Sequence, residues 1–306
     1  MTREEALRRI ERVANEKLSE LDLSGLQLEE VPLKITKCRR LDSLSLSCNQ
    51  ITSIPEWLGE LPNLKWLNLN GNQITSIPEA LGQPSNLQWL KLNLSENQIT
   101  SIPERLEQFS NLTTLDLSQN KITSIPEALG QLSNLEYLDL SKNQITSTSI
   151  PEALRQLSNL EYLDLSENQI TSIPEALGQL SNLKWLFLSE NQITSIPEAL
   201  GKLSNLTQLD LSENQITSTS IPEALGKLSN LGWLSLSCNQ ITSIPEALGQ
   251  LSYLTNLYFY ENEITSIPEA LVQLSYLEYL DLGENPITFI PEALRQLPRL
   301  NIYMDS

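Results

Sequence analysis

One phrase recurs along the chain. The ten residues NQITSIPEAL occur four times without a change, beginning at Asn72, Asn168, Asn191 and Asn239, and close variants fill most of the remaining sequence. A fixed period of this kind predicts an array of stacked units that share one continuous core. A reactive site is normally a unique arrangement of different groups, so function should reside in the residues that change between copies.

The repeating unit can be written Leu-x-x-Leu-x-Leu-x-x-Asn-x-Ile-x-x-Ile-Pro. Eleven units follow one another without a gap from Leu41 to Arg299, eight of them with 23 residues and three with 25. We therefore predict one elongated domain rather than two. The predicted parts of residues 1–306 are a capping helix at 1–17, an atypical first repeat at 18–40, the eleven repeats at 41–299 and a truncated C-terminal strand at 300–306.

Each constant position of the unit has a predicted structural role. Leu163 and Leu165 alternate with polar or aromatic neighbours, a period of two that predicts a short strand with the leucines inward. Because every copy returns by the same path, the strands should pair in parallel on the concave face of a curved α/β solenoid, a horseshoe. The proline after the inward isoleucine predicts extended or short helical segments on the convex face.

The invariant asparagine of each unit lies where the chain leaves the strand. Its amide can satisfy backbone groups that the turn leaves unpaired in the core, and a row of ligand-binding amides is the alternative. At the N-terminus, Ala6, Ile10 and Val13 mark one face of a helix, and Thr2 with Glu5 predicts a capping box. That helix is expected to cover the core of the first repeat.

The spacing of the unit is that of leucine-rich repeats. Its 23-residue form, with Ile-Pro after the asparagine, resembles the intracellular repeats of scribble-like scaffolds and of bacterial, especially cyanobacterial, Roco proteins. Residues 18–32, LSELDLSGLQLEEVP, look like the first repeat of the bacterial group. Roco proteins also carry a GTPase, but the sequence has no G-x-x-x-x-G-K-[ST] phosphate loop. The resemblance therefore implies a binding scaffold without the GTPase.

Composition argues against several classes of function. Histidine is absent, so the usual general base and the commonest metal ligand are missing, and we expect no enzyme, cofactor or metal site. The net charge of -18 repels phosphate backbones and anionic membranes, so neither is an expected partner. Three unpaired-looking cysteines (Cys38, Cys48 and Cys238), a charged N-terminus and no long apolar run favour the cytoplasm.

The outward strand positions are where the copies differ. At the third position of the eleven units, seven residues are Trp or Tyr, and aspartates recur two positions later. Aligned aromatic side chains on a solvent-facing surface are typical anchors of binding sites, although stacking along the ladder is an equal alternative. The candidate partner-binding residues are Trp66, Trp89, Tyr137, Asp139, Tyr162, Asp164, Trp185, Phe187, Asp210 and Trp233.

Three hypotheses follow from this face. As an interaction scaffold, its acidic and aromatic surface would bind a basic segment of another protein. As a peptide or carbohydrate recognition module, it would stack rings on tryptophan and bind hydroxyl groups through aspartate. As an enzyme, it could use only the aspartate row, and no cofactor motif accompanies that row. We favour the non-enzymatic scaffold.

Three two-residue insertions and the C-terminal end depart from the pattern. The insertion near Lys91 should lengthen the strand region without changing its alternation, which places Trp89 in the outward row. Thr-Ser insertions at 145–151 and 216–222 lie 71 residues apart, which suggests duplication of a three-unit block. At the end of the chain, Leu294, Leu297 and Leu300 should have little cover, and weak self-association could occur there.

Overall fold

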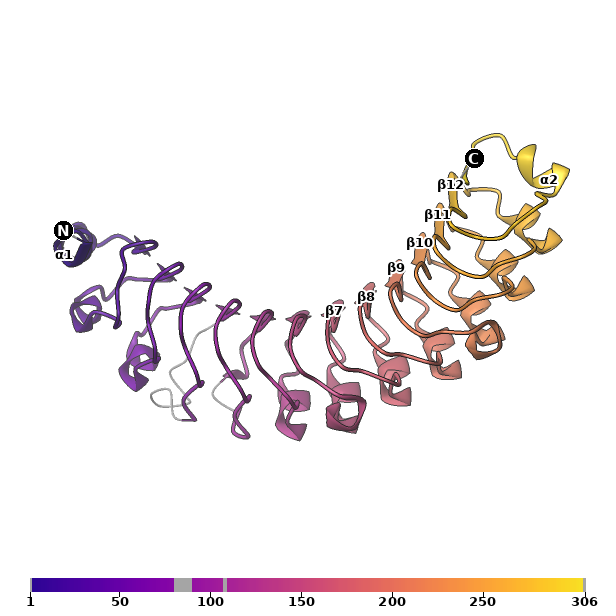
Figure 1. Cartoon of the computed structure of the whole chain (residues 1–306). Helices are drawn as coiled ribbons and strands as arrows, with labels where there is room; N and C mark the ends of the chain where they lie inside the picture. Colours follow the sequence, from indigo (N-terminus) through magenta and orange to yellow (C-terminus); the bar gives the residue numbers. More distant parts are fainter. Residues whose placement is uncertain (1, 80–89, 107–108, 305–306) are drawn as a thin grey trace. The chain divides into compact units, whose positions relative to one another are not determined.

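The computed structural model describes residues 2–79, 90–106 and 109–304. It contains two compact units. The first comprises Met1–Ile145 with Ser149–Leu160, and the second comprises Thr146–Thr148 with Glu161–Ser306. In each unit, successive turns of chain are stacked, with the strands along the inner side of the curve and short helices along the outer side (Figure 1). This is the predicted leucine-rich repeat solenoid.

Each strand is three residues long and pairs in parallel with the next strand of its unit. The register aligns inward leucines, as in Leu44 with Leu67 and Leu186 with Leu209. The first unit contains β1 (Glu20–Asp22), β2 (Ser43–Ser45), β3 (Trp66–Asn68), β4 (Lys91–Asn93), β5 (Thr114–Asp116) and β6 (Tyr137–Asp139). The second contains β7 (Tyr162–Asp164), β8 (Trp185–Phe187), β9 (Gln208–Asp210), β10 (Trp233–Ser235), β11 (Asn256–Tyr258), β12 (Tyr279–Asp281) and β13 (Asn301–Tyr303).

The outer side of each unit carries short 3-10 helices. Most of them follow the repeated proline, whose extended backbone turns the chain, as at Pro197 with φ -72° and ψ 146°. The extended and short helical segments expected on this side are therefore confirmed. The described elements are η1 (Leu33–Lys37), η2 (Glu56–Glu60), η5 (Glu127–Gln131), η6 (Ser147–Ser149), η7 (Glu152–Gln156), η8 (Glu175–Gln179), η9 (Glu198–Lys202), η10 (Ser218–Ser220), η11 (Glu223–Lys227), η12 (Glu246–Gln250), η13 (Glu269–Gln273) and the α-helical turn α2 (Glu292–Arg295).

Helix α1 (Thr2–Glu16) covers one end of the first unit's core. Ala6, Ile10 and Val13 are buried, as their spacing predicts, and the Cys38 thiol donates a 3.7 Å hydrogen bond to the Ile10 carbonyl. The predicted capping helix is therefore present. The predicted capping box depends on the side chain of Thr2, which lies outside the described residues.

Glu5, the other half of the predicted capping box, has a different partner. Its carboxylate accepts hydrogen bonds at 2.8 Å from both Arg8 and Arg9, and these bonds lower the pKa of Glu5 to about 2. The pairing is local to the exposed side of α1. Arg9 also donates a 2.9 Å hydrogen bond to the carbonyl of Asp22, which joins the helix to the first strand.

The asparagine row has the predicted structural role. Asn262 accepts the backbone N–H of Ile241 at 3.0 Å, and its amide nitrogen donates to the carbonyls of Leu236 and Phe259 at 2.9 and 3.1 Å. One side chain thus satisfies backbone groups of two successive turns of chain. Because such groups would otherwise be buried without partners, the asparagine holds neighbouring repeats together.

The insertion near Lys91 does not lengthen the strand. Strand β4 has three residues like every other strand, and its register sets Lys91 opposite Trp66. The two extra residues therefore precede the strand. Lys91 holds the outward position opposite Trp66, and the prediction for Trp89 falls on a residue outside the described part of the chain.

The two Thr-Ser insertions form equivalent contacts with the next turn of chain. The hydroxyl of Ser218 accepts the backbone N–H groups of Thr242 and Ser243 at 2.8 and 2.9 Å. The hydroxyl of Ser147 accepts those of Thr171 and Ser172 at 2.7 and 2.8 Å. In each insertion, one serine hydroxyl therefore links two successive repeats through the same pair of hydrogen bonds. We call this serine and its two bonds the Thr-Ser clasp.

The C-terminal end is better covered than the sequence suggests. Leu294 is fully buried, because helix α2 packs against η13, so the prediction that this leucine lacks cover is wrong. Leu297 and Leu300 are half-buried. Strand β13 pairs in parallel with β12 and aligns Ile302 with the inward Leu280, as expected for the truncated strand.

Candidate binding face

The strand face of each unit consists of the outward side chains, which are the first and last residues of each strand. We call the first residues the first row and the last residues the second row. In the second unit, the first row is Tyr162, Trp185, Gln208, Trp233, Asn256, Tyr279 and Asn301. The second row is Asp164, Phe187, Asp210, Ser235, Tyr258, Asp281 and Tyr303.

The predicted site residues divide between the two units. Of those in the first unit, Tyr137 donates a 3.3 Å hydrogen bond from its hydroxyl to Asp139, and Asp139 lies in register with Asp116. Trp66 is not beside this pair, because strands β4 and β5 lie between β3 and β6. The first unit therefore does not gather its predicted residues into one patch.

The second unit brings six predicted residues onto adjacent strands β7 to β10. The register places Asp164 opposite Phe187, and Phe187 opposite Asp210, in the second row. The rings of Tyr162 and Phe187 are 5.5 Å apart between centroids and inclined at 49°. Two carboxylates thus flank the Phe187 ring, and the Tyr162 ring packs against it.

A lysine lies at the edge of the same patch. The ammonium of Lys184 is 2.8 Å from a carboxylate oxygen of Glu161 and 5.9 Å from the centroid of a Trp185 ring. Both members of the ion pair are 41% exposed, so the pair contributes little to stability. Lys184 pairs with Glu161 in the position before the first row. Among the described residues, no lysine or arginine forms an ion pair with the second-row carboxylates of the second unit.

The second-row aspartates also have a structural role that sequence reasoning missed. One oxygen of Asp210 accepts the backbone N–H of Ser212 at 3.0 Å, and Asp164 accepts that of Ser166 at 2.8 Å. These bonds close the turn after the strand. Asn93 makes the same bond in the first unit, accepting the backbone N–H of Ser95 at 2.9 Å. Asparagine can therefore replace aspartate here without loss of the turn.

Burial makes the charge of Asp164 unfavourable. Desolvation raises the pKa of Asp164, and the negative charge of Asp210 raises it further, against hydrogen bonds from Ser166 and Tyr162 that lower it. An ionised carboxylate in this position would be stabilised by an incoming cation. Among the described residues, no cation offsets the charge of Asp164.

Strands β8 and β11 each place an aromatic ring in the second row. Phe187 and Tyr258 replace the second-row aspartate and so give up its turn-closing bond. Tyr258 packs against Trp233, with centroids 5.4 Å apart and planes inclined at 46°. Sequence reasoning left Tyr258 and Asp281 out of the site, although the 71-residue offset between the Thr-Ser insertions was the signal that could have found them.

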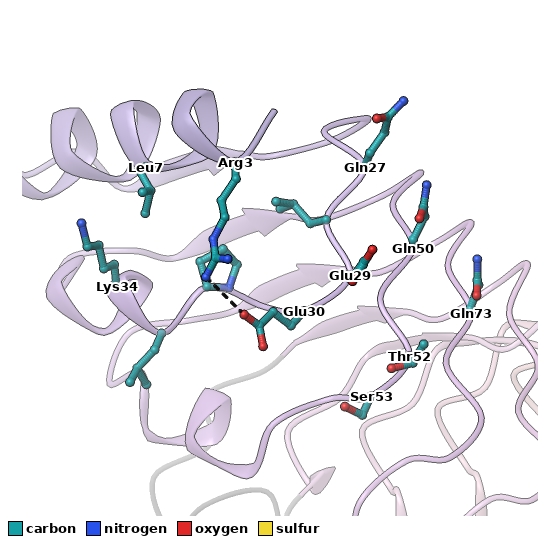
Figure 2. A pocket seen from close by; sticks show the side chains of 13 residues that line it. Arg3, Leu7, Gln27, Glu29, Glu30, Lys34, Gln50, Thr52, Ser53 and Gln73 are labelled. Atoms are coloured by element: carbon teal, nitrogen blue, oxygen red, sulfur yellow. Dashed lines mark ion pairs between the residues drawn. The ribbon is translucent and has the colours of Figure 1, made fainter. Parts of the chain in front are cut away.

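A pocket of the first unit lies away from the strand face. It has a volume of about 1070 Å³ and is lined by α1 and by the segments that follow the first strands, where Gln27, Gln50 and Gln73 form a row (Figure 2). Arg3 and Glu30 form a 3.5 Å ion pair across it, and both are at least 80% exposed. Its charges are solvated and partly paired, so it is a weaker candidate than the strand face.

Two classes of feature are missing from the part of the chain that the structure describes. Residues 2–79, 90–106 and 109–304 contain no cluster of three or more Cys, Asp or Glu side chains that could hold a metal ion. Nor does any helix in these ranges have the length and apolar character needed to cross a membrane.

Family profiles identify the repeat. A leucine rich repeat profile matches residues 16–74, 39–93, 91–145 and 252–306, a leucine-rich repeat region profile matches 127–240, and a third leucine rich repeat profile matches 230–251. The chain belongs to the leucine-rich repeat family. A comparison with curated proteins gives no match.

Solved structures share the fold over most of the chain. An internalin (InlF) from Listeria monocytogenes is 26% identical, with 98% of this chain and 94% of that chain covered and a TM-score of 0.75. The plant peptide hormone receptor RGFR1, in complex with RGF2, is 31% identical over 90% of this chain, with a TM-score of 0.71. The receptor kinase ectodomain GASSHO1/SCHENGEN3 from Arabidopsis thaliana is 32% identical over 89%, with a TM-score of 0.69. This chain spans 50% and 39% of those two plant receptor chains.

Proposed function

We propose that this protein is a non-enzymatic interaction scaffold whose second unit binds a basic segment of another protein on its strand face. The observation that carries the proposal is the second-row sequence Asp164, Phe187, Asp210 on three adjacent strands. A lysine or arginine side chain over the Phe187 ring would interact with the ring face and with both carboxylates. Tyr162, Trp185 and Trp233 supply apolar contact area around it.

The electrostatics of Asp164 support this proposal. Its raised pKa reflects the cost of burying a charge beside Asp210. A bound cation would offset that cost, so part of the binding free energy would come from relief of repulsion already present in the free protein. Phe187 supports the proposal too, because aspartate at this position would have closed the turn as Asp210 does.

The comparisons support a macromolecular or peptide partner. The RGFR1 structure is described as a peptide hormone receptor in complex with RGF2, and the GASSHO1/SCHENGEN3 ectodomain as a complex with CASPARIAN STRIP INTEGRITY FACTOR 2. Peptide recognition is therefore the nearest alternative to binding a folded protein. Carbohydrate recognition is favoured by one observation, the stacked rings of Tyr279 and Tyr303, with centroids 6.3 Å apart and planes inclined at 9°.

The cellular location, origin and domain organisation of the protein are also proposals. We propose a cytoplasmic bacterial protein with 23-residue repeats like those of Roco proteins, folded as one continuous domain and without nucleic-acid or membrane partners. The net charge of -18 and the free thiols of Cys38, Cys48 and Cys238 support this setting. Weak self-association at the C-terminal end is supported by Phe289 and Tyr303, which are 69% and 53% exposed.

A charge-neutralising variant tests the proposed site. Peptides are first selected against the wild-type protein from a displayed library of random linear sequences, and we expect arginine and lysine to be enriched. The double variant Asp164→Asn with Asp210→Asn keeps the turn-closing acceptors, as Asn93 does. Its affinity for the selected peptides should fall about tenfold or more.

The matched control neutralises two carboxylates on the outer side of the same unit. Glu175→Gln with Glu198→Gln removes the same amount of charge from η8 and η9. Its affinity should stay within about twofold of the wild-type value, since exposed charges far from a contact have small effects. Equal losses from both double variants would show that net charge, not the strand face, governs binding. A glycan array read with Tyr279→Ala tests the carbohydrate alternative.

A further inference from the structure

The second unit repeats its own strand face. Residues 71 positions apart occupy equivalent places, which pairs Ser147 with Ser218, Tyr162 with Trp233, Phe187 with Tyr258 and Asp210 with Asp281. The Thr-Ser clasps at Ser147 and Ser218 make the same hydrogen bonds. Duplication of a three-repeat block explains the copies, and it also duplicates whatever the block binds.

The repeated part includes the geometry of the face. Tyr162 and Phe187 pack with centroids 5.5 Å apart at 49°, and Trp233 and Tyr258 pack with centroids 5.4 Å apart at 46°. In each copy an aspartate stands in register on the strand that follows the second ring. We call these the two aromatic–carboxylate corners, composed of Tyr162, Phe187 and Asp210 in the first and of Trp233, Tyr258 and Asp281 in the second.

Each corner contains one half-buried aspartate that uses a single carboxylate oxygen to close its turn. The Oδ1 atoms of Asp210 and Asp281 accept the backbone N–H groups of Ser212 and Gly283, both at 3.0 Å. Within the described residues, neither Oδ2 atom accepts a hydrogen bond from the protein. A free carboxylate oxygen beside an aromatic ring suits a lysine or arginine side chain. The second row beside the corners also differs, since Asp164 of the first block corresponds to Ser235 of the second.

The distance between the two corners determines which peptide conformation can contact both of them. They are three strands apart, and at about 4.8 Å between neighbouring strands this is about 14 Å. An extended peptide advances about 3.3–3.6 Å per residue, so side chains four residues apart are also about 14 Å apart and point to the same side. In an α-helix the same spacing in sequence spans only about 6 Å.

We propose that the two corners form a bivalent site for an extended segment that carries two cationic residues four positions apart, Arg-x-x-x-Arg or its lysine equivalents. The inference rests on the proposed function, because it names the form of the basic partner. Occupation of one corner raises the effective concentration of the second cation at the other corner. The spacing of the two charges, and not only their number, then determines affinity.

The test varies the spacing alone. Three synthetic peptides of equal length and composition carry two arginines that are two, four or six positions apart in a background of serine and threonine. All three spacings place both arginines on one side of an extended chain. With wild-type protein, the four-residue spacing should bind at least about fivefold more tightly than the other two, as expected when only one peptide reaches both corners.

Variants of each corner then separate bivalent binding from general electrostatic attraction. Asp164→Asn with Asp210→Asn removes both carboxylates beside Phe187 at the first corner, and Asp281→Asn removes the carboxylate of the second. All three substitutions keep the turn-closing acceptor, and the unfolding midpoints of the variants serve as folding controls. Each variant should abolish the spacing preference and leave three equal, weak affinities. Equal binding of all peptides by the wild type would overturn the bivalent site but leave the basic-segment function in place. No binding of any basic peptide, including those selected from the library, would overturn the proposed function itself.

Discussion

Asn214 accepts the backbone N–H of Ile193 at 2.9 Å, although the two residues belong to successive repeats. Its amide nitrogen donates to the carbonyls of Leu188, Leu211 and Ser212 at 3.0–3.2 Å. A single buried side chain therefore completes the backbone hydrogen bonding of two turns of chain. The energetic linkage between neighbouring repeats depends on this amide as well as on leucine packing.

Removal of that amide should be costly. Asn214→Ala leaves backbone groups buried without partners and should lower the free energy of unfolding by about 1–3 kcal/mol. The matched control is Asn205→Ala, since the exposed amide of Asn205 makes one bond, at 2.8 Å, to the carbonyl of Ser181. Denaturant unfolding of both variants measures the difference. Equal midpoints would contradict the assigned role of the asparagine row.

The Thr-Ser clasp should contribute less, because it is exposed. Ser218→Ala removes the acceptor of the Thr242 and Ser243 N–H groups. Because water can replace this acceptor, we expect the free energy of unfolding to fall by only about 1 kcal/mol. Ser195→Ala, an exposed serine of a repeat without the insertion, should change stability by less than about 0.5 kcal/mol. Thermal unfolding compares them, and a neutral Ser218→Ala would show that the insertion is not a clasp.

The repeated glycine of the outer side is predicted to be required by close packing. A Cβ atom at Gly201 would lie 2.4 Å from the carbonyl oxygen of Ala224 in the next repeat. Gly201→Ala should therefore lower the free energy of unfolding by about 1–3 kcal/mol. Gly232→Ala is the control, since its nearest neighbour would be 3.8 Å away. Similar unfolding midpoints for the two variants would show that the outer helices can separate at little cost.

Asp164 gives a prediction for pH dependence. Its pKa in the folded protein is raised above the ordinary 3.8, mainly by burial, so its ionised form destabilises the fold at neutral pH. Asp164→Asn should therefore raise the unfolding midpoint at neutral pH. The advantage should shrink as pH falls through the raised pKa towards 3.8, where wild-type Asp164 becomes protonated in both states. A variant less stable than wild type at neutral pH would contradict this account.

Much of the fold follows directly from the spacing of the repeat. The alternation around Leu163 predicts a strand with one inward residue, and the mixed hydrogen-bonding capacity of asparagine predicts its place in the turn. The position of β4 could not be predicted in this way. Units that start at Leu87 or at Trp89 both preserve the alternation, because the insertion has an even length. Only strand pairing distinguishes them, and it sets Lys91 opposite Trp66.

The site was predicted less completely than the fold. The outward row of aromatic residues was visible, but the turn-closing bond of Asp210 depends on local backbone geometry that a residue pattern does not specify. The same limit applies to Glu213, which precedes Asn214 and has a φ of +53°, a left-handed conformation that favours glycine. Duplication was recognised from the insertions, and its 71-residue offset points to Tyr258 and Asp281. Only the register of the strands shows that these two residues lie side by side.

Site-specific cross-linking tests the central claim most directly. The Arg-x-x-x-Arg peptide, carrying a photoreactive group between the two arginines, is irradiated with the protein, and mass spectrometry identifies the labelled residues. Binding on the strand face predicts labels on strands β8 to β11, near Phe187, Gln208 and Trp233, and their loss in Asp210→Asn with Asp281→Asn. Labels confined to the outer helices η8 and η9, or unchanged in the double variant, would contradict the account.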